Sequence, residues 1–304
     1  MGKHPRETIG LVVVDAWRCI EVKEGYIEGA KGRLWYSVYG EDRKGTPLLV
    51  VHGGPGFLSM PQVLSDLADE RPVYFYDQLG CGKSDKAKDM DDYSVEYYTK
   101  ELDDVIEGLE LSEVILFGHS WGAGLVCSHM LENKPEGVKA LILSSPYLST
   151  PIWEEDMKKL VSKLPEPMVE IIRKAESDHE YGEDYFGVMM EFYKRHMYTH
   201  TPFPGYLMEA IGAINQELYG VMWGPSDLEL TGKLRSFDLS PRLGEITVPV
   251  LLICGDRDEM DVRTLRDFQM AMSKGQMAVI PDAGHMNHLE KPDIFKAVVR
   301  DFLD

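Results

Sequence analysis

The chain has 304 residues, 44% of them hydrophobic, and its 51 acidic and 32 basic side chains give a formal net charge of −19. This composition is typical of a globular protein with a large core, and no apolar run reaches the roughly 18 residues that a membrane span requires. The negative charge repels phosphate backbones and anionic lipids, so we expect neither nucleic acid nor a membrane as partner. An acidic surface that serves only solubility would give the same charge, which therefore identifies no ligand.

The beginning of the sequence and the cysteines bear on location. The first residues lack the basic and then apolar pattern of a secretory signal. The cysteines lie far apart, with no paired spacing typical of disulfides or zinc sites: Cys19, Cys81, Cys127 and Cys254. We expect a cytoplasmic protein with reduced thiols and no metal.

Short apolar segments alternate with amphipathic ones over the first 145 residues, the pattern of a sheet with helices on its faces. Residues 33–40 alternate as in a half-exposed strand. Continuous apolar runs predict buried parallel strands within 47–54, 72–78, 113–120 and 138–146. Because the carboxyl ends of parallel strands meet at one edge, we expect His52, Asp77, Ser120 and the serines at 144 and 145 to lie there.

From about residue 150 the pattern becomes helical. Thr150 is the predicted N-cap of the first helix and Pro151 its first residue. Residues 150–236 hold no convincing strand and predict a helical cap inserted into a core made of residues 1–149 and 237–304. In the second part of the core we expect two more buried strands and a closing helix, within 248–258, 275–284 and 291–304.

Gly118, Ser120 and Gly122 form a G-x-S-x-G motif directly after a predicted buried strand and before a predicted helix. A serine on such a sharp turn needs small neighbours because the backbone is strained and crowded. The arrangement is typical of the nucleophile elbow in the α/β-hydrolase fold, which has a mostly parallel central sheet. The sequence therefore predicts this fold, with Ser120 as nucleophile.

A serine hydroxyl needs an imidazole to accept its proton and a carboxylate to orient that imidazole. In this fold the expected order along the chain is Ser, Asp, His. Asp256 and Asp258 both follow a predicted strand, and His285 follows the next one. His288 comes three residues later, just before Leu289, and is expected to face elsewhere.

The segment His52-Gly53-Gly54-Pro55-Gly56 follows another predicted strand. Its glycines let the backbone approach a ligand and present free N–H groups. An oxyanion hole would take the N–H groups of Trp121 and Gly54. The run from Gly80 to Ser84 ends like a phosphate-binding loop but lacks the upstream glycine, so no cofactor is expected.

Taken together, HGGPG, YDQLGCGKSD, GHSWG, GDRDE and the last GH resemble the proline iminopeptidases, including the tricorn-interacting aminopeptidase of archaea. The resemblance spans nearly the whole chain and implies Ser120 as nucleophile, His285 as base and Asp258, in preference to Asp256, as the acid.

The same resemblance implies two ligands for a substrate ammonium group. These are Glu259, directly after the predicted acid, and Asp227 in Trp223-Gly224-Pro225-Ser226-Asp227, where the family has WGPSE. His119 is a second departure, since the family elbow is commonly GGSWG. Both departures affect the pocket rather than the core chemistry.

The sequence thus predicts a serine aminopeptidase that forms an acyl-enzyme and releases an N-terminal residue, preferably proline. Its partners would be short peptides or aminoacyl amides with a free N-terminus. The same catalytic groups would serve an esterase, a lactonase or an amino-acid amidase, because a fold does not fix a substrate. A catalytically silent receptor is a further alternative, against which the intact set of catalytic residues argues.

Overall fold

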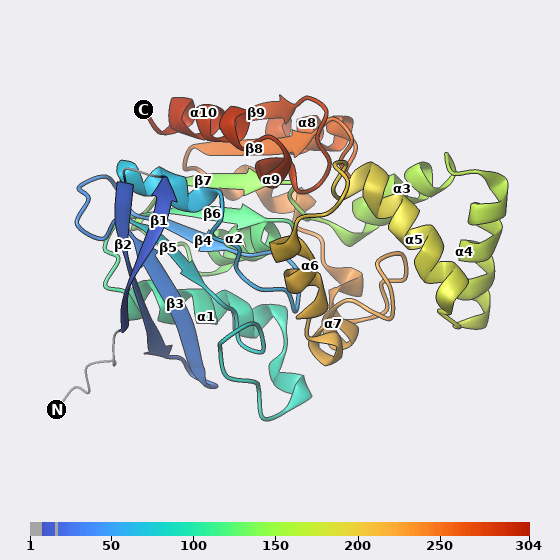
Figure 1. Ribbon diagram of the computed structural model, residues 1–304, viewed down its shortest axis with the longest axis horizontal. Coiled ribbons are helices and arrows are strands. Elements are labelled where there is room, and N and C mark those ends of the chain that lie inside the picture. Colours follow the sequence, from blue (N-terminus) through green and yellow to red (C-terminus); the bar gives the residue numbers. More distant parts are fainter. Residues whose placement is uncertain (1–7, 16–17) are drawn as a thin grey trace.

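The computed structural model describes the backbone of residues 8–15 and 18–20 and all atoms of residues 21–304. Its strands form one nine-stranded sheet in the order β1-β2-β3-β5-β4-β6-β7-β8-β9 (Figure 1). In this order, each neighbouring pair from β1 to β5 is antiparallel, and each neighbouring pair from β5 to β9 is parallel. The antiparallel strands are Thr8–Asp15, Arg18–Glu28 and Arg33–Tyr39. In chain order, the strands β4 to β9 are Leu48–Val51, Val73–Tyr76, Val114–His119, Val138–Ser144, Val250–Gly255 and Gly275–Ile280.

The continuous apolar runs form central strands, as predicted. Every residue of β4, β5, β6 and β8 is buried, because helices cover both faces of this part of the sheet. Along β4, Leu49 and Val51 pack on one face while Leu48 and Val50 pack on the other. The two hydrophobic cores therefore lie on opposite faces of one sheet.

Two strand predictions were wrong in their exposure. The strand β3 was expected to be half-exposed, but only Arg33 is exposed. It lies between β2 and β5, and Leu34 and Tyr39 pack into the cores on opposite faces of the sheet. The strand β9 was expected to be buried, yet only Ile280 is, because β9 is an edge strand.

Helices cover the sheet on both sides. One face packs against α1 (Val95–Gly108), α2 (Trp121–Glu132) and α8 (Val262–Ala271). The other packs against α10 (Pro292–Leu303), the predicted closing helix, and a 3₁₀ helix at Leu64–Asp69. Short helices also occur at Met90–Asp92, Lys233–Ser236, Ser240–Glu245 and α9, Asn287–Glu290. No helix in the described part of the chain has both the length and the apolar character needed to cross a membrane.

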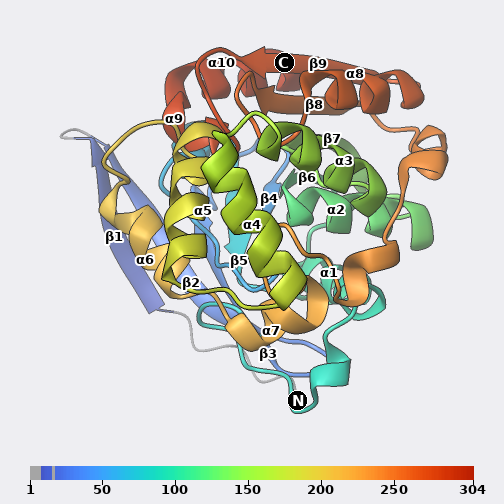
Figure 2. The ribbon, with the colours of Figure 1, turned by 90° about the vertical axis from the view of Figure 1, so that its right-hand side faces the viewer.

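Five α-helices occupy the chain between β7 and β8 and lie beyond the carboxyl ends of the parallel strands (Figures 1 and 2). They are α3 (Thr150–Val161), α4 (Glu166–Asp178), α5 (Glu183–His196), α6 (Gly205–Gly212) and α7 (Gln216–Met222). The predicted N-cap was off by one residue, since Ser149 is the cap. Thr150 is already helical and its hydroxyl donates a hydrogen bond to the Leu234 carbonyl over 2.6 Å. The function of residues 150–236 as a cap stays a prediction.

Candidate active site

Ser120 lies on the sharp turn between β6 and α2. Its φ of +53° is in the left-handed region, which side-chain-bearing residues rarely adopt. A Cβ on Gly118 would lie 2.5 Å from Ala123 Cα, and one on Gly122 would lie 2.2 Å from the Val51 carbonyl oxygen. Only glycine fits at either position, so the motif presents a strained serine at the carboxyl edge of the sheet.

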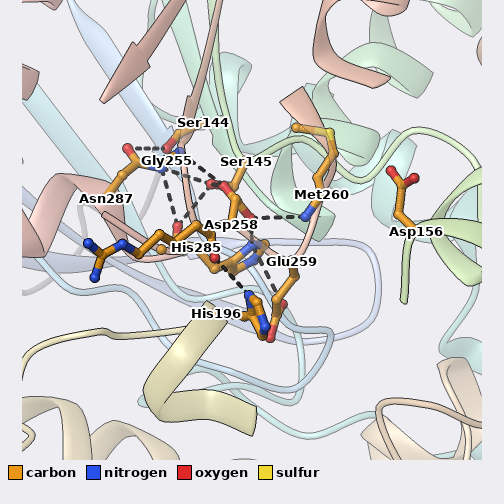
Figure 3. A network of polar contacts seen from close by, with 12 residues as sticks. Ser144, Ser145, Asp156, His196, Gly255, Asp258, Glu259, Met260, His285 and Asn287 are labelled. Atoms are coloured by element: carbon orange, nitrogen blue, oxygen red, sulfur yellow. Dashed lines mark hydrogen bonds and ion pairs between the residues drawn. The ribbon is translucent and has the colours of Figure 1, made fainter. Parts of the chain in front are cut away.

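Asp258 and His285 form a hydrogen-bonded pair at the same edge. His285 Nδ1 lies 2.9 Å from Asp258 Oδ1, and both side chains are buried (Figure 3). The other carboxylate oxygen, Oδ2, accepts a hydrogen bond of 2.6 Å from the Ser145 hydroxyl. This arrangement holds the imidazole so that its Nε2 is free for another partner.

The alternative acid, Asp256, lies elsewhere. It is exposed, and its carboxylate accepts a hydrogen bond of 3.3 Å from the backbone N–H of Ala283. The structure therefore pairs His285 with Asp258, which the resemblance implied.

Hydrogen bonds of Ser145, Asn287 and Glu290 hold this pair in place. Ser145 accepts a hydrogen bond from Asn287 Nδ2 over 2.8 Å, next to its contact with Asp258 (Figure 3). Glu290 Oε1 accepts from the Gly284 N–H over 2.7 Å, one residue before His285. Ser145 was expected at this edge, but nothing in the pattern pointed to Asn287 or Glu290.

The helical segment is joined to the histidine loop by its backbone. The N–H groups of His285 and Met286 donate to the carbonyls of His196 and Met197 over 2.7 and 2.8 Å. His196 is the last residue of α5. The position of His285 therefore depends on α5 as well as on the sheet.

The glycine-rich turn after β4 lies beside Ser120. A Cβ on Gly53 would lie 3.3 Å from the Cβ of Ser120, and Gly54 has a φ of +126° that favours glycine. Trp121 is the first residue of α2, so its N–H has no acceptor within the helix. Of the two N–H groups predicted for an oxyanion hole, that of Trp121 belongs to the residue after the serine and that of Gly54 to the adjacent glycine-rich turn.

Hydrogen bonds of Gln78 tie these turns together. Its side-chain amide donates to the His52 carbonyl over 2.9 Å and accepts from Trp121 Nε1 over 3.1 Å. Its backbone N–H donates to His52 Nε2 over 3.0 Å. The segments HGGPG, YDQLG and GHSWG therefore form one rigid unit around the serine.

Asp227 and Glu259 both line the cavity that contains Ser120 and His285. The hydroxyls of Tyr193 and Tyr219 donate hydrogen bonds to Asp227. Glu259 is buried, with Oε2 3.6 Å from His285 Nδ1. The structure thus brings the two predicted amine ligands into the same cavity as the predicted catalytic groups.

The acids and the imidazole shift one another's protonation. Burial raises the pKa of Glu259 to about 7, and the Asp227 and Asp258 carboxylates add to this rise against the opposing effect of His285. Burial lowers the pKa of His285, but the charges of Glu259 and Asp258 outweigh it and raise that pKa to about 9. This end of the cavity consequently favours a bound cation.

The cavity has a volume of about 400 Å³ and lies between the edge of the sheet and the helical segment. Aromatic and methionine side chains of α3, α5 and α7, with the residue that caps α7, form most of its helical side, which we call the helical wall: Trp153, Tyr185, Met189, Tyr193, Tyr219 and Trp223. Such a cavity holds a small ligand with a few polar contacts in apolar surroundings.

His119, which stands where the proline iminopeptidases commonly have glycine, packs between two other imidazoles. Its ring centroid lies 5.0 Å from that of His285 and 4.8 Å from that of His288. Burial and the neighbouring rings of His288 and His285 lower the pKa of His119 well below its ordinary value. His288 is buried against His119 and Phe295 and does not line the cavity. The neutral imidazole of His119 therefore packs against His285 and supports its position.

A family model described as alpha/beta hydrolase fold matches residues 46–292, so the chain is an α/β-hydrolase. A proline iminopeptidase of Heyndrickxia coagulans is 37% identical over 284 residues, which cover 92% of this chain and 98% of that protein. The chain belongs to the proline iminopeptidase family, as its motifs predicted.

Two solved structures support the same placement. The proline iminopeptidase of Mycobacterium smegmatis superimposes with a TM-score of 0.83 at 27% identity, and the structure of VinJ with a TM-score of 0.87 at 30% identity. Each match covers 92% of this chain and 97% of the other. The likeness therefore includes the helical segment as well as the sheet.

Proposed function

We propose that the protein is a serine aminopeptidase that releases an N-terminal residue, preferably proline, from short peptides and aminoacyl amides with a free N-terminus. The observation that carries the proposal is the cavity itself, in which two acidic side chains lie beside a serine and a carboxylate-bound imidazole. Membership in the proline iminopeptidase family supports the same activity.

In the proposed reaction, Ser120 Oγ attacks the carbonyl carbon of the first residue while His285 Nε2 accepts the hydroxyl proton. Asp258 keeps the Nδ1–H of the imidazole in place and stabilises the cation that forms. The N–H groups of Trp121 and Gly54 would bind the negative oxygen of the tetrahedral intermediate. Its collapse breaks the C–N bond, and the departing amine takes the proton from His285.

The second half of the reaction uses water in place of the serine. His285 removes a proton from water, which attacks the acyl-enzyme and releases the free amino acid. Ser120 regains its proton from His285 as the ester bond breaks.

The proposed amine ligands set the choice of substrate. An α-ammonium group between Asp227 and Glu259 would form charge-assisted hydrogen bonds in a cavity with few other polar groups. An ester without an amine could use the same catalytic groups but would gain nothing from these acids. The acids therefore favour an aminopeptidase over an esterase.

The location proposed is the cytoplasm. The four cysteines lack paired spacing, and Cys81, Cys127 and Cys254 are buried free thiols. Reduced thiols are the usual state there.

The test is hydrolysis of a prolyl arylamide and of its N-acetyl form by the parent and by Ser120→Ala. The parent should cleave the free arylamide and leave the N-acetyl form intact, because acetylation removes the charge that the acids would bind. Ser120→Ala should lower kcat by about 10⁶, since the covalent route is lost. Equal cleavage of both substrates, or turnover by Ser120→Ala within about tenfold of the parent, would contradict the proposal.

A further inference from the structure

The lining of the cavity has a polar part and an exposed apolar part. Its polar part contains the buried Glu259 and the half-buried Asp227, which accepts hydrogen bonds from the hydroxyls of Tyr193 and Tyr219. Its exposed apolar part, which we call the apolar rim, contains Phe186 and Met190 of α5 and Met208 of α6. Because the rim side chains are exposed, they lie at the opening of the cavity, where the leaving group of a substrate bound by its amine would depart.

The apolar rim is unusually exposed. Seven large hydrophobic side chains among the described residues are exposed, and three of these line this one cavity: Phe186 at 59%, Met208 at 48% and Met190 at 38%. Single exposed apolar side chains are ordinary, but a group of them around a cavity marks a binding surface. Methionine adapts its shape to varied apolar partners, so the rim suits a range of apolar groups.

The charged side chains that line the cavity are mostly acidic. Among the described residues that line it, Asp227 and Glu259 are the acidic ones, and there is neither lysine nor arginine. The cationic group in this lining is His285, which already pairs with the Asp258 and Glu259 carboxylates. A ligand carboxylate placed here would therefore lose water without gaining a free cationic partner, and it would face two carboxylates. A carboxylate directly beside the scissile bond is thus disfavoured.

We propose that the apolar rim is the subsite for the leaving group, and that it selects uncharged apolar leaving groups. The preferred substrates are peptides with an apolar second residue that is not the C-terminus, together with aminoacyl amides of apolar amines. Dipeptides with a free carboxylate are poor substrates. This inference rests on the aminopeptidase function proposed above.

Three substrates separate the two parts of the inference: prolyl-leucine amide, prolyl-glycine amide and prolyl-leucine with a free carboxylate. The leucine amide should exceed the glycine amide in kcat/KM by about tenfold or more, because its side chain is buried against the rim. It should exceed the free acid by about tenfold or more, because the carboxylate has no partner.

Lysine variants test whether the missing cation causes the second preference. In at least one of Met190→Lys and Met208→Lys, the ratio of kcat/KM for the leucine amide to that for the free acid should fall about fivefold or more. The control is Met270→Lys on α8, which adds the same charge at a methionine that is 70% exposed and does not line the cavity. In this control the ratio should stay at the parent value.

The outcomes distinguish this inference from the proposed function. Leucine and glycine amides cleaved equally well would overturn the apolar subsite, provided the free prolyl arylamide is cleaved. An amide-to-acid ratio near one, or a ratio that neither lysine variant at the rim lowers, would overturn the charge selection. If the parent cleaves no prolyl substrate, the aminopeptidase function is wrong and the inference falls with it.

Discussion

The edge of the sheet and the helical wall face each other across one cavity, but they are built differently. At the edge, Asp258 accepts hydrogen bonds from His285 and Ser145, and Gln78 joins three turns around Ser120. In the wall, the indole N–H groups of Trp153 and Trp223 are buried and have no hydrogen-bond partner among the described residues.

This difference indicates separate roles for the edge of the sheet and the helical wall. The hydrogen bonds of Asp258 and Gln78 fix the geometry of the reacting groups before the substrate arrives. Buried donors without partners favour a ligand that supplies acceptors. The edge is thus organised for chemistry, and the helical wall for choosing what the chemistry acts on.

Asp258→Asn would remove the charged partner of His285 at the edge of the sheet. We expect it to reduce catalysis more than a change of Glu259 or Asp227 does. The imidazole would lose its correct tautomer and the charge that stabilises its cation, so kcat should fall by about 10⁴. Asp256→Asn is the matched control, since Asp256 is exposed and bonded to Ala283 instead. Steady-state rates on a prolyl arylamide compare the two, and a greater loss in Asp256→Asn would show that the acid was misassigned.

Glu259→Gln tests how a cavity acid acts on a catalytic group, because Glu259 lines the cavity and its Oε2 lies 3.6 Å from His285 Nδ1. The readout is the pH dependence of ester hydrolysis. The reaction needs neutral His285, so kcat/KM for a neutral ester such as phenyl acetate should rise as pH passes its pKa of about 9. Removing the Glu259 charge takes away the first of the causes that raise this pKa, so the acid limb should move to lower pH. The ester rate at pH 8 should then increase. An unmoved limb, or one displaced to higher pH, would mean that Glu259 does not act on His285.

The sequence predicted the edge well for a physical reason. A strained serine turn requires glycines at fixed positions, and Gly118 and Gly122 are visible in the sequence. The parallel strands are recognisable in the sequence as apolar runs, and polar residues lie together at their carboxyl ends. The pairing of His285 with Asp258 rather than Asp256 came from the family motif, because both aspartates follow the same strand.

The rest depends on packing between distant segments. Asn287 and Glu290 act through contacts with Ser145 and Gly284 that no local pattern records. The predicted exposure of β3 and β9 was wrong because the position of a strand in the sheet, not the pattern of residues within it, decides whether the strand is covered. Likewise, methionines and aromatics at helical spacing look alike whether they fill a core or line a cavity.

The central claim is that the acids of the cavity choose the substrate while the edge performs the reaction, and one measurement on Asp227→Asn tests it most directly. It is kcat/KM for a free prolyl arylamide relative to that for phenyl acetate, in the variant and in the parent. Removing one carboxylate from a buried charged contact costs about 2 to 5 kcal/mol, so the arylamide value should fall about 30-fold or more. The ester value should not fall, because the ester has no amine to lose its partner. An equal loss on both substrates would contradict the claim, and Asp227 would then be structural.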